Sequence, residues 1–428
     1  MNPTAIEDHA KLVLLQWMII IAAAWVFGRL GKKLGQPLAV GEILAGILLG
    51  PSALGAIWPA DWPVLFPTET QQSLQLLGKL GLILLLFQVG MEFDYGHLRS
   101  RSRTVTAVSV TGILVPFLCG LAIGPWLHRN FAPALPQFGF QLFLCIALSI
   151  SALPIMGRIL LEMKLERTAI GAMGVSAAAI DDVTGWILLA LATALVSSGF
   201  DGWKLLGQVV GVIAFFLVLQ KVVGPWLRRV WVQSQQRTQH AGMSASYLTL
   251  LLLVLFGCCL ISNRLGVFAI FGAFLLGVSL HQQLDLVKAW RDRFSEFVIV
   301  AMVPIFFTNT GLNTEIGSLQ TGFAWLGCAL VLAAAVAGKL GGCFLGARLT
   351  GQSNREAGCI AALMNTRALM ALVAINIGLD LKLLNRELFT MLVIMALLTT
   401  AMTEPLLRWW LPKDLRPKHD AGRGGDGK

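Results

Sequence analysis

Long apolar segments follow one another along almost the whole chain, and this repetition limits its possible folds more than any other feature. Thirteen segments come close to the roughly 17–25 residues that a helix needs to cross a bilayer. Their approximate limits are 12–28, 38–55, 76–91, 106–127, 139–157, 168–197, 205–224, 247–262, 266–280, 297–314, 323–347, 356–379 and 388–410. Because lipid offers no hydrogen bonds to the backbone, such segments must be helical. We therefore predict an all-α membrane protein with about thirteen transmembrane helices.

The distribution of positive charge predicts how these helices are oriented. When Lys79, Lys221 and Arg408, which lie near segment ends, are counted with the adjoining connections, the odd-numbered connections and the C-terminus carry 24 Lys and Arg residues, whereas the N-terminus and the even-numbered connections carry seven. Basic connections stay in the cytoplasm, so we expect an inner (plasma) membrane protein with its N-terminus outside and its C-terminus inside. The same asymmetry explains the formal net charge of +10 without a nucleic-acid partner.

The last residues, 412–428, are polar and rich in glycine, unlike residues 1–411. This composition predicts a short disordered cytoplasmic tail, with no nucleotide-binding regulatory domain after the membrane part. The sequence has no GxGxxG pattern and no GxxxxGK pattern of the kind that binds nucleotides. Its Cys and His residues indicate neither a metal site nor a disulfide framework. We expect no cofactor.

A short motif recurs at the ends of the third and tenth segments. "LILLLFQVGMEFD" (82–94) and "VPIFFTNTGLNTEI" (303–316) each combine an aromatic residue, a glycine, an apolar residue and an acid. The two segments are seven helices apart, and an odd offset reverses the orientation in the membrane. We therefore predict two inverted-topology repeats, formed by segments 1–6 and 8–13. Transporters of this design bind substrates near the midplane, where broken helices meet.

The fifth and twelfth segments, which are equivalent members of the two repeats, are the candidates for broken helices. "SISALPIMGR" contains Pro154, which we expect to remove a donor in mid-helix and to free the carbonyl of Ile150. "LMNTRALM" places three polar residues in an apolar run: Asn365, Thr366 and Arg367. We predict that the two broken helices meet near the midplane. The alternative is a proline kink beside a polar packing cluster.

Two adjacent acids in the sixth segment, "AAAIDDVTGW", are the strongest functional signal. Asp181 and Asp182 lie in mid-helix, where ionisable groups are costly and by default indicate function. Neighbours on a helix point about 100° apart, so one acid can face an aqueous cavity and the other a partner helix. Na⁺ and K⁺ are hard cations that prefer oxygen ligands. We predict that both acids bind the transported cation and protons, with oxygen ligands added by Ser149 and Ser151.

Lys339 is the only lysine placed deep in an apolar segment in this division of the chain. It lies in "AAAVAGKLGGCFLG", where Gly338, Gly342 and Gly346 recur every four residues and allow close helix packing. Because it is too far from the helix end to reach water, an internal partner is favoured. We hypothesise that Lys339 pairs with Asp181 while the site holds no cation.

Four stretches resemble the monovalent cation:proton antiporter-2 family, whose members exchange sodium or potassium for protons. They are "QPLAVGEILAGILLGPSALG" (36–55), "GLILLLFQVGMEFD" (81–94), "AAAIDDVTGW" (177–186) and "PIFFTNTGLNTEI" (304–316). The resemblance implies a sodium/proton exchanger-like domain over 1–411. In it, helices 4–6 and 11–13 form a core that moves like an elevator against a dimerisation domain of helices 1–3 and 8–10. The two broken helices cross in this core, and we expect Arg367 to neutralise carbonyl ends at the crossing. It also implies a homodimer, and it makes Asp182 the main carrier of ion and proton.

One position departs from that resemblance. After Arg367 the family commonly has Gly and often Glu, whereas this chain has Ala368, Leu369 and Met370. These three positions hold no acid, so the role that the resemblance would give to an acid after Arg367 does not carry over to this chain.

These features favour exchange of Na⁺ or K⁺ for H⁺. A carboxylate that binds either a proton or a cation couples the two fluxes when only the loaded carrier can cross. If cation binding also releases a proton from Lys339, the exchange is electrogenic. A channel or uniport-like pathway and a non-transporting ion sensor remain as alternatives. An aspartyl protease needs two facing carboxylates from different segments, so we do not expect an enzyme.

Overall fold

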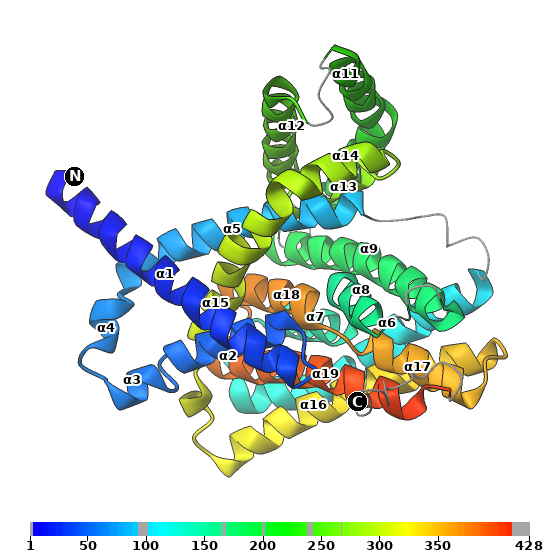
Figure 1. The fold of residues 1–428 in the computed structure, drawn as a ribbon. Coiled ribbons are helices and arrows are strands. Elements are labelled where there is room, and N and C mark those ends of the chain that lie inside the picture. The colour runs from blue at the N-terminus through cyan, green and yellow to red at the C-terminus, as the bar shows by residue number, and fades with distance from the viewer. Residues whose placement is uncertain are drawn as a thin grey trace, which may run out of the picture.

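The computed structural model describes residues 3–92, 102–163, 165, 168–198, 202–237, 243–266 and 268–412. Within these residues the chain is almost entirely helical (Figure 1). The α-helices are α1 (Pro3–Lys33), α2 (Leu38–Leu49), α3 (Leu54–Ile57), α4 (Trp62–Leu65), α5 (Thr68–Met91), α6 (Ser102–Phe131), α7 (Gln137–Ser149), α8 (Leu153–Glu162), α9 (Ala169–Ser198), α10 (Gly202–Val218), α11 (Gly224–Arg237), α12 (Ala245–Arg264), α13 (Ala269–Leu280), α14 (Leu284–Trp290), α15 (Val303–Leu312), α16 (Gly322–Leu349), α17 (Asn354–Met364), α18 (Ala368–Asp380) and α19 (Arg386–Trp410). Short π-helical turns at Leu219–Val223, Arg291–Ser295 and Val298–Met302, and a 3-10 turn at Ile316–Ser318, complete the order.

Nine helices in the described residues are long and apolar enough to cross a membrane, or ten if a bent pair is one span. The pair joins 284–295 to 298–318 with a bend of 44°. Three shorter apolar helices lie at Gln137–Ser149, Ala269–Leu280 and Met370–Asp380. The helical class is therefore confirmed, and the count of thirteen spans stays a prediction. Of the predicted tail, all but Pro412 lies outside the described residues.

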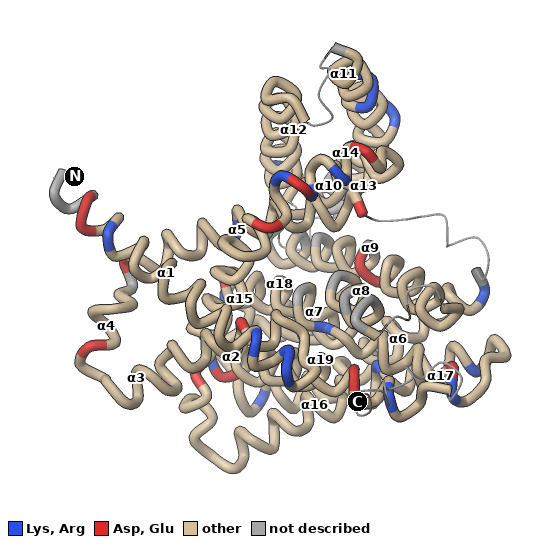
Figure 2. The backbone as a smooth tube through the Cα atoms, viewed as in Figure 1, with Lys and Arg blue, Asp and Glu red and all other residues tan. Residues whose placement is uncertain are grey.

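Charge is concentrated near helix ends. α12 is tan along nearly its whole length in Figure 2, with a basic residue only at its end. In Figure 1, α11 and α12 project from the rest of the molecule, while α7, α8 and α18 lie in its interior. α6, α9, α16 and α19 pack around that interior group.

Local sequence explains several helix boundaries. Ser353 caps α17 in a capping box, in which the side chains of Ser353 and Glu356 each accept a hydrogen bond from the other's backbone N–H. Asn385 caps α19 by accepting a hydrogen bond from the N–H of Leu388. Gly351 follows α16 with φ +88°, a backbone conformation that favours glycine.

The fifth and twelfth predicted segments are each interrupted, at residues 150–152 and 365–367. The two interruptions meet, because the N–H of Ala152 donates a 2.8 Å hydrogen bond to the carbonyl of Thr366. Helix ends leave backbone donors and acceptors unpaired. The crossing therefore brings the ends of four short helices, α7, α8, α17 and α18, to one place.

The expected role of Pro154 is wrong in one respect. Pro154 is the second residue of α8 and does not lie in mid-helix. Ile150 is extended (φ −74°, ψ 138°) and its N–H bonds to the carbonyl of Ile146 at 3.1 Å. α7 therefore ends before the proline, which occupies a first-turn position that tolerates it without losing a helical hydrogen bond.

Glycines set the closest helix contacts. A β-carbon on Gly311 at the end of α15 would lie 2.7 Å from Cα of Gly46 in α2. One on Gly90 at the end of α5 would lie 3.1 Å from Cα of Gly277 in α13. The first distance is too short for a side chain, and a β-carbon on Gly90 would also lie 2.4 Å from the carbonyl oxygen of Phe274, so only glycine permits these approaches.

The glycine series of α16 acts in the same way against α6. β-Carbons on Gly338 and Gly342 would lie 2.7 Å from Cα of Pro116 and 2.5 Å from the carbonyl oxygen of Thr111. α16 and α6 can therefore pack backbone to backbone. This packing carries Lys339, which is on the same helix, toward the interior.

Candidate functional site

Asp181 in α9 is surrounded by donors from three other segments. Ser109 Oγ of α6 donates to its Oδ1 at 2.6 Å. Lys339 Nζ of α16 lies 2.7 Å from its Oδ2 and forms an ion pair. Ser151 Oγ, from the α7–α8 break, lies 3.1 Å from the same Oδ2. Both carboxylate oxygens are therefore hydrogen-bonded, and the negative charge is matched by an adjacent ammonium group.

Lys339 is completely buried, and its ammonium group uses all its donors. Besides Asp181, Nζ donates to the carbonyl oxygens of Gly112 at 2.9 Å and Ser149 at 2.6 Å. The Ser149 carbonyl is at the last residue of α7, where helical carbonyls lack partners within the helix. The lysine thus ties α6, α7, α9 and α16 together.

Asp182 is in a different position from its neighbour. It is 2 % exposed, and among the described residues its Oδ1 has no hydrogen-bond partner. The backbone of Leu153, the first residue of α8, lies beside the same carboxyl group. A helix N-terminus favours negative charge, but a buried carboxylate oxygen without a partner is costly. Binding of a proton or a cation at Oδ1 would remove this cost.

The two serines of the fifth segment are used differently. Ser151 Oγ lies between Asp181 and the carbonyl of Met364, at 3.1 and 2.9 Å. Ser149 Oγ instead donates to backbone carbonyls, that of Cys145 at 2.7 Å and that of Ile113 at 3.1 Å. In this structure Ser149 therefore contributes its carbonyl to Lys339, and its hydroxyl is directed to the backbone.

Arg367 lies at the N-terminal end of α18 and is completely buried. Its Nη1 donates to the carbonyls of Ala147 and Leu148 in the last turn of α7, and its Nη2 donates to the carbonyl of Ala335 at 2.7 Å. Cations near a helix C-terminus offset its negative partial charge. Arg367 thus contacts the carbonyl ends that the sequence analysis expected it to neutralise.

Asn365 and Thr366 attach the second break to α19. The side chain of Asn365 donates to the carbonyl of Thr399 at 3.2 Å, while its own Oδ1 has no partner among the described residues. The hydroxyl of Thr366 lies 3.1 Å from that of Thr403. Thr400 accepts hydrogen bonds from the backbone N–H groups of Arg367 and Ala368.

Sequence reasoning missed these α19 threonines and also Ser109. The threonines occur in "LLTTAMTEP", and three hydroxyls in an apolar segment were a visible signal. Ser109 in "AVSVTG" had no such signal, because a single serine in an apolar helix often bonds to its own backbone. Only the packing of α6 against α9 brings it to Asp181.

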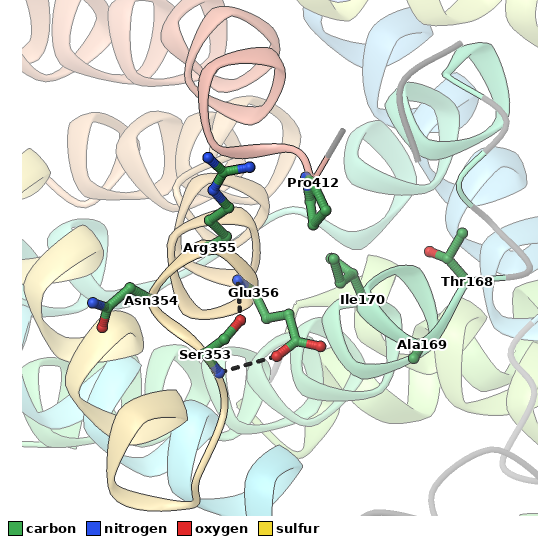
Figure 3. Close-up of a pocket in the computed structure, with 8 residues that line it drawn as sticks. All are labelled: Thr168, Ala169, Ile170, Ser353, Asn354, Arg355, Glu356 and Pro412. Carbon is green, nitrogen blue, oxygen red and sulfur yellow. Dashed lines mark hydrogen bonds between the residues drawn. The ribbon is translucent and has the colours of Figure 1, made fainter. Parts of the chain in front are cut away.

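A separate cavity of about 540 Å³ lies at the first turns of α9 and α17 (Figure 3). It is lined by the capping-box residues Ser353 and Glu356, by Arg355, and by Thr168 and Ile170 of the facing segment. None of the predicted site residues lines it. The carboxyl group of Glu356 accepts a hydrogen bond from the backbone N–H of Ser353. This pocket therefore lies at capped helix ends, and neither Asp181 nor Asp182 lines it.

The comparisons with known proteins agree on one family. The family model described as "Sodium/hydrogen exchanger, transmembrane" matches residues 18–409. The Na⁺/H⁺ antiporter NhaS4 of Synechocystis sp. is 35% identical over 400 residues, covering 92% of this chain and 96% of the relative. Cation/H⁺ antiporter 20 of Arabidopsis thaliana is also 35% identical, and the match covers 92% of this chain but 48% of that longer protein.

A solved structure supports the fold independently. The sodium proton antiporter MjNhaP1 from Methanocaldococcus jannaschii superimposes with a TM-score of 0.66 over 94% of this chain and 97% of that one, at 15% sequence identity. The family and its matched relatives are transporters, which are integral to membranes and are not enzymes in the usual sense. From the family model and the identity to NhaS4 together, this chain belongs to the sodium/hydrogen exchanger family of membrane antiporters.

Proposed function

We propose that this protein is a secondary active antiporter that exchanges Na⁺ or K⁺ for H⁺ by elevator-type alternating access. The observation that carries the proposal is the contrast between two adjacent acids. Asp181 has both oxygens bonded and a lysine partner, whereas Asp182 keeps one buried oxygen without a partner. A buried carboxylate in that condition needs a proton or a cation, and competition between the two couples their fluxes.

The cation would bind at Asp182 with help from the broken helices. Carboxylate, amide and hydroxyl oxygens are the ligands that hard monovalent cations accept. Ser151 and the partner-free Oδ1 of Asn365 both belong to the crossing and supply candidates of this kind. The N-terminus of α8 stabilises the charged form of Asp182 when the cation has left.

The pair of Asp181 and Lys339 provides a second proton. When a cation draws Asp181 toward itself, the buried ammonium loses its anionic partner, and a buried lysine without such a partner gives up its proton more readily. Two protons then exchange for one cation, so that transport is electrogenic. The competing interpretation is that this pair only holds α9 and α16 together.

The glycine contacts support an inverted repeat. In the predicted numbering, α5 and α15 are the third and tenth spans, and α2 and α13 are the second and ninth. α15 meets α2 at Gly311 and Gly46, and α5 meets α13 at Gly90 and Gly277. Spans 2 and 9 are equivalent members of the two repeats, and so are spans 3 and 10. Replacing each span by its equivalent therefore converts the contact of spans 10 and 2 into the contact of spans 3 and 9. This symmetry supports the model of thirteen spans in two repeats.

The same numbering divides the helices into two groups. α6–α9 and α16–α19, with the crossing, would form the moving core, and α1–α5 and α12–α15 would form a dimerisation domain that makes a homodimer. The charge asymmetry of the connections supports an N-terminus outside and a C-terminus in the cytoplasm. A C-terminal fusion to a reporter that is active only in the cytoplasm should be active, and inactivity there would contradict this orientation.

The central experiment is exchange in proteoliposomes, with Na⁺, K⁺, Li⁺ and Rb⁺ added separately under a proton gradient. The Asp182→Asn variant keeps the shape of the side chain but can neither take up a proton nor hold a cation by charge. It should insert normally and lose exchange. Cation flux without proton movement in the wild type would indicate the channel alternative. Absence of both fluxes from wild-type protein that binds cation would indicate an ion sensor.

A second measurement tests the electrogenic step. An imposed membrane potential should change the wild-type exchange rate, and the Asp181→Asn variant should keep some exchange without this response. If the potential has no effect on the wild type, transport is electroneutral and the role given to Lys339 is wrong.

A further inference from the structure

A small polar cavity lies where α18 meets α5 and α15, away from the crossing of the broken helices. Its volume is about 30 Å³. The polar side chains that line it are Gln75 and Lys79 of α5, Asn309 of α15, and Asn376 and Asp380 of α18. A volume of this size holds about one water molecule, and therefore one small ion.

The two asparagines that line this cavity have side-chain oxygens for which the described residues provide no donor. Both amide hydrogens of Asn376 are used, since Nδ2 donates to Thr310 Oγ1 at 3.0 Å and to the carbonyl of Leu372 at 2.8 Å. Its Oδ1 therefore remains as the free acceptor. Asn309 is 9 % exposed, and within the described part of the chain its side chain makes no hydrogen bond although it lines the cavity. Its amide is therefore free to contact a ligand in the cavity.

An ion pair closes the cavity on its exposed side. Lys79 Nζ lies 3.0 Å from Asp380 Oδ2, and the two side chains are 59% and 47% exposed. The second oxygen of the Asp380 carboxylate is left for another ligand. The ammonium group of Lys79 thus occupies the Asp380 carboxylate, in the place that a free monovalent cation could take beside the cavity.

We propose that this cavity is a second, weaker site for the monovalent cation, bound by oxygens of Asp380, Asn309 and Asn376 after it displaces Lys79. One carboxylate with neutral amide oxygens fits a singly charged hard cation, and an ammonium group beside it disfavours higher charge. The inference deepens the proposed antiport and rests on it for the identity of the cargo. The site loads the cation on its way to Asp182.

The position of α18 supports this route. α18 begins at the crossing, directly after Arg367, and Asn376 lies about 12 Å further along it at 1.5 Å per residue. The same helix therefore connects the cavity with the broken-helix site. α5 and α15 pack on each other, whereas α18 packs on α7 and α19, so the cavity lies between the two groups of helices.

A purely structural interpretation uses the same contacts. The pair of Lys79 and Asp380 could simply fasten α18 to α5. Variants of the two residues separate these interpretations. If the cavity binds a cation, Lys79 competes with it for Asp380, so removing the lysine and removing the carboxylate should change the half-saturating cation concentration in opposite directions. If the pair only fastens the helices, the two removals should act in the same direction.

The test measures exchange in oriented proteoliposomes, with Na⁺ or K⁺ added to one side at a time. On the side reached by the cavity, Lys79→Met should lower the half-saturating cation concentration roughly two- to fivefold, as expected for loss of an exposed ion pair. Asp380→Asn should raise it about tenfold, since hydrogen-bonded charged groups contribute most. Half-saturation on the other side should not change. Lys11→Met, which breaks the exposed pair with Asp8 and changes no residue that lines the cavity, is the matched control.

If Lys79→Met and Asp380→Asn shift the half-saturating cation concentration in the same direction, or not at all, the proposed site is wrong and the ion pair only holds α18 to α5. Asn309→Asp adds a ligand charge and should lower the half-saturating concentration, which gives a further check if Asp380→Asn folds poorly. Equal shifts on both sides would also contradict the proposal.

Equilibrium binding of radioactive Na⁺ or Rb⁺ to purified protein separates this inference from the antiport itself. In an Asp182→Asn background the cavity should still bind cation, and adding Asp380→Asn should remove that binding. Asp380-dependent binding in that background, together with absence of exchange by the wild-type protein, would leave the site intact while refuting the antiport. Absence of Asp380-dependent binding overturns the site.

Discussion

Lys339→Met is the substitution with the largest consequence that the geometry permits. Methionine has nearly the length and volume of lysine but no charge and no donor. The change removes the ion pair with Asp181 and the hydrogen bonds to the carbonyls of Gly112 and Ser149. All these groups are buried, so water cannot replace the lost donor.

The magnitude follows from those contacts. At 2.7 Å, with an effective dielectric constant of about 20, the attraction between the two charges is about 6 kcal/mol. Desolvation of both groups opposes it, and removing one partner of a buried pair costs about 3–5 kcal/mol. Asp181 keeps its bonds to the two serines and can take up a proton, which limits the loss. We expect a destabilisation of about 4 kcal/mol.

The assay is thermal unfolding of purified protein in one detergent. The fraction of protein that remains monodisperse is measured at each temperature. Lys79→Met is the matched control for stability. It makes the same chemical change in an exposed ion pair with Asp380 at 3.0 Å, where the loss should stay within about 1 kcal/mol. A clear gap in melting temperature between the two variants is the expected result.

The double variant Lys339→Met with Asp181→Asn tests the cause. If the loss comes from an unpaired buried charge, removing both charges should recover a large part of it, since neutral replacements of buried pairs are often tolerated. A double variant that is as unstable as the sum of the single variants would refute this reasoning. So would a Lys339→Met protein that melts with the wild type.

Three further outcomes are expected. Pro154→Ala should leave exchange close to wild type and cost less than about 1 kcal/mol, because the α7–α8 break does not depend on the proline; a large loss of transport at normal stability would contradict this. Gly311→Ala should strongly lower thermal stability, since its β-carbon would lie 2.3 Å from the carbonyl oxygen of Ile43. Gly257→Ala, where nothing lies within 4 Å, should be neutral or stabilising by up to about 1 kcal/mol in the same melting assay. Arg367→Lys should lower the thermal stability of the protein although it keeps the positive charge, because an ammonium group cannot reproduce the planar guanidinium that contacts α7 and α16 together. A variant that melts at the wild-type temperature would count against that role.

The helical class and the position of the two acids could be predicted from the sequence, because both depend on local properties. Hydrophobic length and the need to pair backbone groups in lipid decide which segments become helices. Asp181 and Asp182 stand out because ionisable groups are rare in such segments. The polar run from Asn365 to Arg367 marked a break for the same reason.

Details within a helix were harder to predict. Pro154 was expected in mid-helix because one apolar run covers both α7 and α8. A run of apolar residues does not record where hydrogen bonding stops, and α7 ends at Ser149 because its carbonyl end meets Arg367 and Lys339.

Tertiary structure decided which groups meet. Lys339 and Asp181 are 158 residues apart, and Ser109 joins them from a third helix. Glycines allow α16 to approach α6 closely enough for the lysine to reach Gly112 and Asp181 together. Asn309 and Asn376 line one cavity only because α15 and α18 lie side by side there. Helix formation depends on neighbours along the chain, whereas these contacts depend on how the helices pack, and packing distances of a few ångströms do not appear in any local pattern.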